Sequence, residues 1–420
     1  MAVGTASRGT VLVSGASIAG PAVAFWLHRH GYDVTVVEKS TGVRGGGYPI
    51  DVRGTAIEVA HRMGILPRLQ EAHIASRRLT FLDADGGEVA VVHPQQLVGG
   101  VEGRDLEVRR GDLTQILFES VHDDVEFIFD DSIDALTDHA HGVDVTFQSG
   151  RERSFDLVLA ADGMHSRTRE LVFGPEHHFH RYLGYCFAAF SMANTLGLSH
   201  EGVIWSTPGK AAVLYAVQDS NELHGFFTFA APQPSYEVLR DPEAQRDLVA
   251  SIFAGDGWEV PTMVGAMRHA NDLFFDTVSQ IRMSRWSRGR VAVLGDAAYA
   301  PSFLTGQGSS LALVGAYMLA DALATHRDHT AAFAAYDRDV RGFVQLNQAG
   351  VGDGGAALFP TTAEALAKRN DRLRGLTSLP PSVGRPAHTA LTLPPERTLQ
   401  KTAGCGAANT TVVHTPTTSA

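Results

Sequence analysis

Two short apolar runs near the start of the chain flank a helical stretch. Residues 10–15 (TVLVSG) form a β-branched run that is typical of a strand buried on both faces, and residues 32–39 (YDVTVVEK) form a second. The chain between them is apolar and carries Pro21, which fits an α-helix only in its first turn, where the amide hydrogens have no partner within the helix. The pattern predicts a strand, a tight turn, a helix and a second strand.

Two later apolar strands are each followed by a motif that pairs glycine with aspartate. Residues 155–161 (FDLVLAA) lead into DGMHSRTR at residues 162–169, and residues 290–294 (RVAVL) lead into GDAA at residues 295–298. After a loop, GQG at residues 306–308 opens a long apolar helix. Strands that alternate with helices in this way predict an α/β fold with a parallel sheet.

From about residue 176 to residue 280 the pattern changes to alternating apolar stretches such as KAAVLYAVQD and ELHGFFTFAA. This alternation indicates antiparallel strands with one covered face. We interpret the region as a substrate domain whose floor meets the cofactor. The candidate substrate-facing residues are Phe187, Trp205, Tyr215, Phe227 and Phe229. The alternative, that these aromatic side chains fill a core between sheet and helices, stays open.

The last hundred residues predict helices and then a tail. Residues 316–350 suit helices that pack on the first domain, and a further helix is expected between residues 362 and 374. Residues 375–420 are rich in Pro, Thr, Ala and Gly without periodicity, so we expect disorder there.

The turn after the first strand suits a phosphate. Gly15, Ser17 and Gly20 occupy the three positions of a G-x-G-x-x-G pattern, in which the first residue turns the chain, the second lets a pyrophosphate approach and the third lets helix pack on strand. We expect the Ser17 hydroxyl to donate to a phosphate oxygen. Glu38 follows about 20 residues later, where a carboxylate binds a ribose diol and repels a 2′-phosphate, so the sequence predicts NAD or FAD. Ile18, Ala19 and Lys39 complete this predicted nucleotide site.

Composition and charge exclude several classes of protein. The 420 residues carry a net charge of -11 without a run of Lys or Arg, which is unlike a nucleic-acid-binding protein, and no stretch predicts a membrane span. Cys186 and Cys405 lie far apart, so we expect no disulfide and a cytoplasmic protein. EHHFH at residues 176–180 lacks the spacing of a familiar metal site, so we predict a polar loop there and no metal.

The motifs together resemble those of the class A flavoprotein monooxygenases, the family of para-hydroxybenzoate hydroxylase, polyketide aromatic hydroxylases and tetracycline-inactivating monooxygenases. The resemblance spans roughly residues 10–345 and includes Asp162 and Gly163. It implies FAD, with Asp296 near the ribityl-phosphate part. It also implies that the amides of Gly306, Gln307 and Gly308 lie under the flavin pyrimidine. Arg110 matches the arginine that lies along the cofactor in this family, and Arg44 and Pro301 are further candidate contacts.

The resemblance implies a discontinuous fold. A Rossmann-like FAD-binding domain would comprise residues 8–75, 100–175 and 281–345, and an inserted antiparallel β-sheet substrate domain would comprise residues 76–99 and 176–280. Residues 346–374 would form a C-terminal helical segment and residues 375–420 the disordered tail.

Three positions depart from the family pattern: Tyr299 stands where histidine is common, Ser310 where asparagine is common and Gly315 where aspartate is common. The triple glycine at residues 45–47 is similar to a motif of flavin amine oxidases, but Tyr48 stands where that motif has arginine. Asp51 and Arg53 follow, either near the flavin ring or in a salt-bridged loop. A halogenase is disfavoured because the four tryptophans are isolated.

The resemblance implies a hydroxylase of secondary metabolism that consumes NADPH or NADH and O2. A C4a-hydroperoxyflavin would insert one oxygen atom into an apolar, aromatic or polycyclic molecule. Because the cofactor carries that chemistry, the sequence requires no catalytic side chain, and we name none. Two alternatives stay open: a flavin oxidase or dehydrogenase that inserts no oxygen, and a flavin-containing protein that binds a ligand without turnover. We expect a monomer or homodimer.

Overall fold

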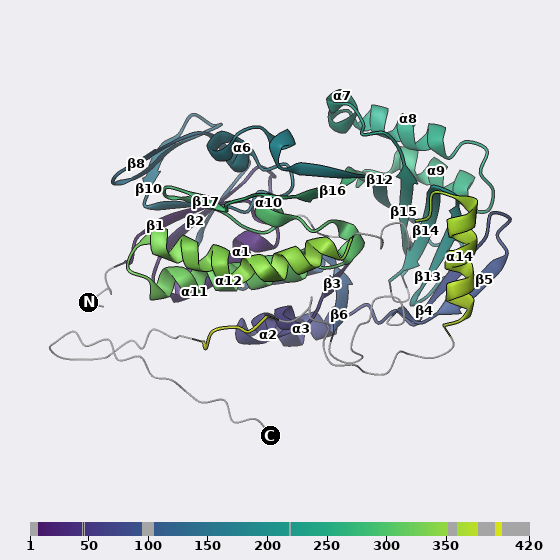
Figure 1. The fold of residues 1–420 in the computed structure, drawn as a ribbon, viewed down its shortest axis with the longest axis horizontal. Helices are drawn as coiled ribbons and strands as arrows, with labels where there is room; N and C mark the ends of the chain where they lie inside the picture. The colour runs from purple at the N-terminus through teal and green to yellow at the C-terminus, as the bar shows by residue number, and fades with distance from the viewer. Residues whose placement is uncertain are drawn as a thin grey trace, which may run out of the picture.

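A computed structural model describes residues 7–43, 45, 47–94, 105–217, 220–351, 359–376 and 391–396. In this part of the chain, two sheets lie side by side, one on the left and one on the right of Figure 1, and strands β12 and β16 run between them.

The first sheet has six strands in the order β17-β18-β11-β1-β2-β7, in which all neighbours are parallel except β17 and β18. Its members are β1 (Thr10–Ser14), β2 (Asp33–Glu38), β7 (Glu126–Phe129), β11 (Leu157–Ala160), β17 (Ser287–Arg288) and β18 (Val291–Val293). The apolar β-branched residues that mark these strands in the sequence are buried, as expected for a parallel sheet covered on both faces.

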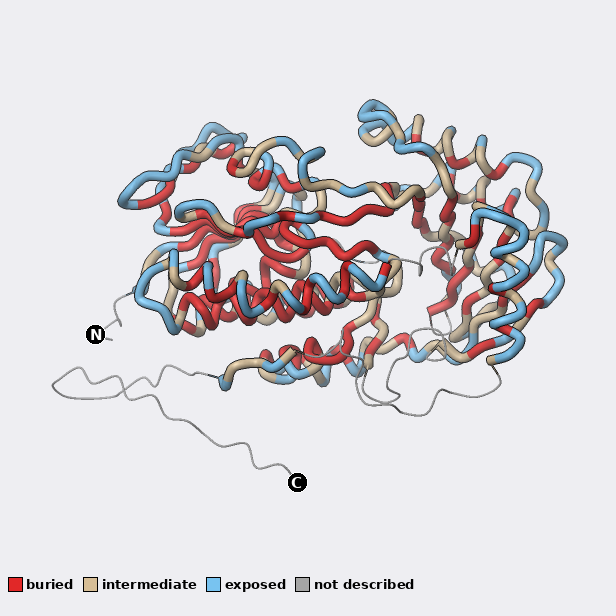
Figure 2. The backbone as a smooth tube through the Cα atoms, viewed as in Figure 1, coloured by how far each residue is buried: buried red, intermediate tan, exposed pale blue. Residues whose placement is uncertain are grey.

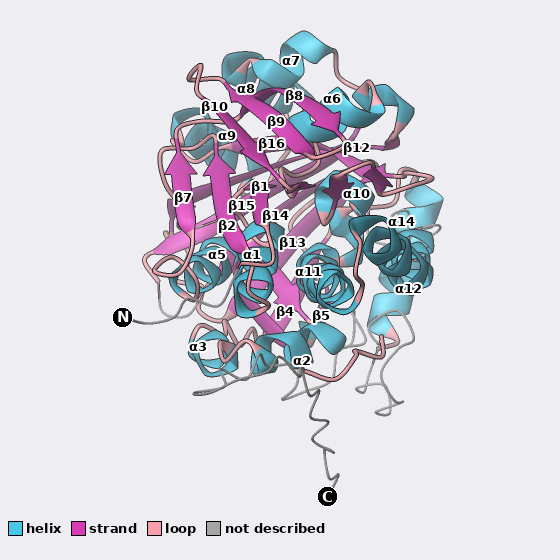
Figure 3. Ribbon diagram, turned by 90° about the vertical axis from the view of Figure 1, so that its left-hand side faces the viewer, coloured by secondary structure: helices cyan, strands magenta, loops and turns pink. Residues whose placement is uncertain are grey.

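Helices cover one face of this sheet and a small antiparallel sheet covers the other (Figure 3). The helices of this layer are α1 (Ala19–Arg29), α5 (Arg110–Glu119), α11 (Gly308–Thr325) and α12 (His329–Ala349). Beyond them lie α2 (Thr55–Arg62), which packs on α11, and α3 (Leu66–Glu71), which contacts α5. The other face packs on β8 (Ile133–His139), β9 (Gly142–Phe147), β10 (Glu152–Phe155) and α6 (Arg167–Phe173). Figure 2 shows the buried strands between these two layers.

The second sheet has seven strands in the order β16-β12-β15-β14-β13-β4-β5. They are β4 (Arg78–Leu82), β5 (Glu88–Val92), β12 (His180–Ala193), β13 (Glu201–Thr207), β14 (Lys210–Ala216), β15 (Glu222–Ala230) and β16 (Phe274–Ile281). Helices α7 (Tyr236–Arg240), α8 (Pro242–Ile252) and α9 (Val260–His269) belong to this half of the molecule, and α8 and α9 supply its helical core residues. Strands from two separate segments of the chain thus form one sheet, which agrees with a substrate domain built from residues 76–99 and 176–280.

A two-stranded sheet joins the halves on the other side. Its strands are β3 (Pro49–Val52) and β6 (Leu106–Arg109), which pair antiparallel so that Asp51 lies opposite Glu107. The remaining short elements are η1 (Glu176–His178), α10 (Asp296–Tyr299) and η2 (Phe303–Thr305).

Helix α14 (Ala363–Arg374) lies on the second sheet, beside β5. Leu373 packs with Phe81, and the guanidinium of the buried Arg369 lies 5.3 Å from the centre of the Phe81 ring and donates to Ser206. The helix expected between residues 362 and 374 is therefore present, and it covers part of the sheet face that looks toward the first domain.

The prediction of disorder from residue 375 onward is wrong for residues 391–396, which dock on the first domain. Thr55 Oγ1 donates to the Leu391 carbonyl and accepts from its amide, at 3.0 and 2.7 Å, and Arg62 and Tyr317 both donate to the Pro394 carbonyl. Glu396 forms an ion pair with Arg29. Leu391 and Leu393 also pack against the first core, and these local contacts replace the regular periodicity that we looked for in the sequence.

Helix α11 is the one described helix long and apolar enough to cross a membrane by length and composition. However, 67% of that stretch is buried inside the protein, where the helix packs against α1, α2 and α12. It is the central helix of the first domain.

The docked segment predicts a difference between two truncations. Deleting residues 377–420 removes the contacts of residues 391–396 and should lower the free energy of unfolding by about 1–3 kcal/mol, as expected for several lost hydrogen bonds and apolar contacts. Deleting residues 397–420 removes none of these contacts and should leave it unchanged. Urea unfolding of both proteins measures the difference, and equal stabilities would show that residues 391–396 do not dock.

Candidate functional site

The three sequence motifs meet at one edge of the parallel sheet. Strands β1, β11 and β18 are adjacent and parallel, so the loops that follow their carboxyl ends lie side by side. This edge is where open α/β sheets bind their ligands.

Two glycines of the first motif permit contacts that no other residue allows. Gly15 has a φ of 103°, and a Cβ there would lie 2.5 Å from the Ala161 carbonyl oxygen. A Cβ at Gly20 would overlap the Gly15 carbonyl oxygen. The start of α1 therefore rests directly on the end of β1. No side chain caps that start, so its amides and the helix dipole are directed at the sheet edge, where they favour an anion.

Ser17 has a partner that explains its place in the turn. Arg110, the first residue of α5, donates from its guanidinium to Ser17 Oγ at 2.8 Å, and its amide donates to the Tyr48 carbonyl at 3.1 Å. The hydroxyl thus holds a positive charge over the turn that should receive a pyrophosphate.

Glu38 lies at the end of β2, beside the same turn. Its carboxylate accepts from the amides of Ala16 and Ser40, at 2.8 and 2.9 Å. The side chain is half-buried, and its oxygens have further lone pairs for a ribose diol. Of the other predicted residues, Ile18 is the N-cap of α1, Ala19 is buried in its first turn, Lys39 is exposed and Arg44 lies outside the described residues.

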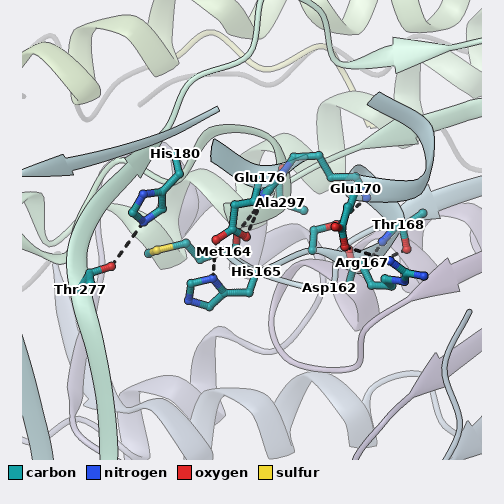
Figure 4. A network of polar contacts seen from close by, with 12 residues as sticks. Asp162, Met164, His165, Arg167, Thr168, Glu170, Glu176, His180, Thr277 and Ala297 are labelled. Carbon is teal, nitrogen blue, oxygen red and sulfur yellow. Dashed lines mark hydrogen bonds and ion pairs between the residues drawn. The ribbon is translucent and has the colours of Figure 1, made fainter. Parts of the chain in front are cut away.

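The second motif is organised by its own side chains (Figure 4). Asp162 accepts from Ser166 Oγ and from the amide and hydroxyl of Thr168, so its carboxylate is engaged at the start of α6. Arg169 is fully buried and donates to the carbonyls of Met164 and Ala297, which ties this motif to the third. Gly163 has a φ of 83°, and a Cβ built there would meet no atom within 4 Å, so the turn is open on that side.

His165 extends this network to the second sheet. Its Nδ1 lies 2.9 Å from Glu176 and its Nε2 lies 3.2 Å from Asp276 on β16. Hydrogen bonds to Asp276 and then to Glu176 raise the pKa of His165 to about 10, so the ring is cationic at neutral pH. Glu176 belongs to the EHHFH stretch, which is a short 3-10 helix followed by the start of β12. Glu176 forms ion pairs with His165 and Arg169, which lie outside this stretch, and no group of three metal-ligating side chains occurs among the described residues.

The third motif supplies the carboxylate of Asp296, the first residue of α10, whose side chain is exposed at the same edge of the sheet. Partial desolvation by the neighbouring residues raises the pKa of Asp296, and the positive charge of Arg110 opposes that rise. A Cβ at Gly308 would lie 3.8 Å from Asp296 Oδ1, and Gly306 has a φ of 61°. The Pro301 carbonyl accepts from Gln280.

The same loop contains a buried hydrogen-bond acceptor that has no partner. Gln307 Oε1 is buried without a hydrogen-bond partner at the N-cap of α11. A buried polar atom without a partner is costly unless a ligand or water satisfies it. The open amides of α1, the Arg110 cation, the Glu38 carboxylate and this acceptor fit the pyrophosphate, ribose and ring donors of FAD.

The candidate substrate residues divide between two faces of the second sheet. Trp205, Phe227 and Phe229 lie in the core between the sheet and helices α8 and α9, so assigning them to substrate was wrong. Phe187 and Tyr215 lie on the opposite face, toward the first domain. The alternation of strand side chains between faces decides each placement.

Sequence reasoning missed the aromatic residues that join Phe187. Tyr48 from the first domain lies 6.1 Å, centre to centre, from each of the Phe187, Phe226 and Phe274 rings. Phe303 of the FAD loop lies 4.7 Å from Phe187. Adjacent phenylalanines at 226 and 227 point to opposite faces, and the pattern of apolar residues alone does not tell which one faces the cofactor.

Comparison with known proteins agrees with this geometry. Residues 8–345 match the family model described as FAD binding domain. The chain belongs to the class A flavoprotein monooxygenases. It is 39% identical over 371 residues to a flavin-dependent monooxygenase from an unknown prokaryotic organism, covering 87% of this chain and 95% of that protein. It is 44% identical over 354 residues to the uncharacterized protein Rv1260 of Mycobacterium tuberculosis, covering 83% and 95% of the two chains.

The crystal structure of tetracycline destructase Tet(55) has the same fold, with a TM-score of 0.79 at 36% identity over 93% of this chain and 99% of that chain. The predicted family, the α/β FAD-binding fold and the assignment as a flavoprotein monooxygenase are confirmed, and FAD is the cofactor.

Two of the departures from the common pattern of these monooxygenases are coupled. A Cβ at Gly315 would overlap the hydroxyl of Tyr299, which accepts a hydrogen bond from Tyr336 at 2.9 Å. Glycine at 315 thus makes room for tyrosine at 299. The third departure, Ser310, has its own partners, because its hydroxyl accepts from the Arg53 amide at 3.0 Å.

The Ser17–Arg110 contact predicts how substitutions change FAD affinity. Ser17→Val should weaken FAD binding about tenfold or more, because a branched apolar side chain displaces the Arg110 guanidinium and crowds the pyrophosphate. Ser17→Gly leaves room for both and should stay within about threefold of the wild type. Titration of the apoprotein with FAD by flavin fluorescence measures both, and a valine variant that binds like the wild type would contradict this account of the turn.

The His165 network predicts a pH-dependent stability. Because its pKa rises to about 10 in the folded state from an ordinary value near 6.5, protonated His165 stabilises the fold fully below about pH 6.5, and this contribution disappears as the pH rises through 10. The difference in unfolding free energy between wild type and His165→Gln should therefore be larger at pH 6 than at pH 9.5. Urea unfolding at both values measures it, with His122→Gln as a surface control. A constant difference would argue against the paired cation.

Proposed function

We propose that this flavoprotein monooxygenase uses NADPH or NADH and O2 to insert one oxygen atom into an apolar aromatic or polycyclic small molecule. The observation that carries the proposal is the aromatic cluster of Tyr48, Phe187, Phe226 and Phe274, which faces the FAD domain. Such rings offer large flat apolar surfaces on which a planar substrate packs.

FAD, when bound, accepts hydride from a reduced nicotinamide nucleotide and activates O2. The residues of the chain stabilise charge on the flavin, orient the substrate and exclude water. The start of α11 directs its amides and dipole at the place where the flavin pyrimidine should gather negative charge. The aromatic cluster orients the substrate and excludes water from the reacting face.

Relatives support the substrate class. The destructases Tet(55) and Tet(51), at 36% and 33% identity, are named for tetracycline, a polycyclic molecule. From these names we extend to this chain only a polycyclic ligand, and we also propose a role in secondary metabolism. We also propose that the enzyme acts in the cytoplasm as a monomer or homodimer.

Isotope labelling tests the reaction. Purified enzyme with FAD, NADPH, 18O2 and a panel of phenols and polycyclic polyketides should yield a product that carries one 18O atom, detected by mass spectrometry. Nucleotide oxidation with formation of hydrogen peroxide, and no label in any product of the panel, would favour an oxidase and contradict the proposal.

A matched pair of variants tests the site with the product so found. Phe226→Ala should lower kcat/KM about tenfold or more with a modest loss of stability, because Phe226 faces the cofactor and is only half-buried. Phe227→Ala, one residue away on the other face, should lose about 3–5 kcal/mol of unfolding free energy and keep its KM. If Phe226→Ala and Phe227→Ala change KM equally, the aromatic cluster is not the substrate site.

A further inference from the structure

Strand β3 and the residue that follows it bring two charged side chains, Asp51 and Arg53, to the glycine loop before α11. Asp51 Oδ1 forms an ion pair with Arg53 at 2.6 Å, and both side chains are largely buried. A Cβ built on Gly306 would lie 2.7 Å from Asp51 Oδ2 and 4.0 Å from an Arg53 guanidinium nitrogen. The pair therefore stands against the loop whose amides should hold the flavin pyrimidine.

The backbone around the pair is tied to α11. The Arg53 amide donates to Ser310 Oγ at 3.0 Å, and that hydroxyl donates to the Asp51 carbonyl at 3.5 Å. Gly54, the next residue, donates from its amide to Asp105, and α2 starts at Thr55. These contacts fix the pair relative to the first turn of α11, so its charges are held in place.

The ion pair has a further negative side chain beside it. Glu107 lies opposite Asp51 on β6 and accepts from the hydroxyls of Tyr215 and Ser76. Burial raises the pKa of Asp51 to about 6, with Arg53 opposing the rise and Glu107 adding to it. Above that pH, Asp51 is ionised and Arg53 is the cation that faces it.

We propose that Asp51 and Arg53 are positioning residues that set the redox potential of the bound flavin, with Arg53 favouring the reduced form and Asp51 limiting that effect. Reduction adds negative charge to the flavin, so a nearby cation stabilises the product of reduction and a nearby carboxylate destabilises it. The inference rests on the proposed placement of the flavin beside Gly306–Gly308.

The expected shift in midpoint potential follows for four variants. Arg53→Gln should lower the midpoint potential and Asp51→Asn should raise it, each changing the ratio of reduced to oxidised flavin at a fixed potential roughly tenfold, about 30 mV for a two-electron couple. The double variant should return close to the wild-type potential, because both charges are removed. Arg53→Lys keeps the positive charge and should stay closer to wild type than Arg53→Gln.

The test is a reductive titration of the FAD-loaded proteins at pH 8 against a reference dye, with circular dichroism to confirm the fold. Asp337 and Arg341 form a comparable ion pair within α12, so Asp337→Asn and Arg341→Gln are matched controls and should leave the potential unchanged. If Arg53→Gln does not load FAD, the direction of the shift in Asp51→Asn still decides the inference.

Unchanged potentials in folded, flavin-loaded Asp51→Asn and Arg53→Gln would overturn the inference, as would control shifts of the same size. If the potentials are unchanged and only the affinity for substrate changes, Asp51 and Arg53 act on the substrate and do not set the flavin potential. The titration uses no substrate, so its result is independent of the oxygen-label experiment that tests the proposed function.

Discussion

The contact between the start of α1 and the end of β1 sets the geometry of the whole cofactor edge. Because Gly20 has no side chain, the helix rests on the Gly15 carbonyl, and its first turn is directed along the strand toward the loops that follow β11 and β18. A larger residue at either glycine forces the helix away from the sheet. Ala19 in that first turn then lies against Gly295, so the first and third motifs are packed together.

Two sets of polar contacts link this edge to the substrate half. On one side, hydrogen bonds of His165 with Glu176 and with Asp276 join the second motif to β16. On the other side, the two-stranded β3–β6 sheet carries Asp51 and Glu107, and Tyr48 directly precedes β3, so these residues lie between the FAD loop and the sheet face. The residues that should contact substrate are therefore positioned by the same elements that position the cofactor.

Much of the first domain was predictable because its signals are local. A buried β-branched run followed by a glycine turn specifies strand and helix start within about ten residues, and Glu38, Asp296 and Gly306–Gly308 follow at fixed places along such strands. Ser17 was predictable as a polar group, but its partner was not, since Arg110 is 93 residues away in the chain.

The substrate side was harder to predict because side-chain direction there depends on register. Phe226 and Phe227 are identical in type, and only the pairing of β15 with β12 and β14 decides which one faces the first domain. Tyr48 joins that cluster from another domain. Residues 391–396 dock through a few specific contacts and have no periodic pattern, so composition alone suggested disorder.

A crystal structure of the FAD-loaded protein tests the central claim most directly. The account predicts that the pyrophosphate lies at the start of α1, within hydrogen-bonding distance of its amides or of Arg110, with the ribose on Glu38 and the flavin pyrimidine against the amides of Gly306–Gly308. A flavin bound elsewhere, with its pyrimidine away from the start of α11, would contradict both the site and the role given to its glycine loop.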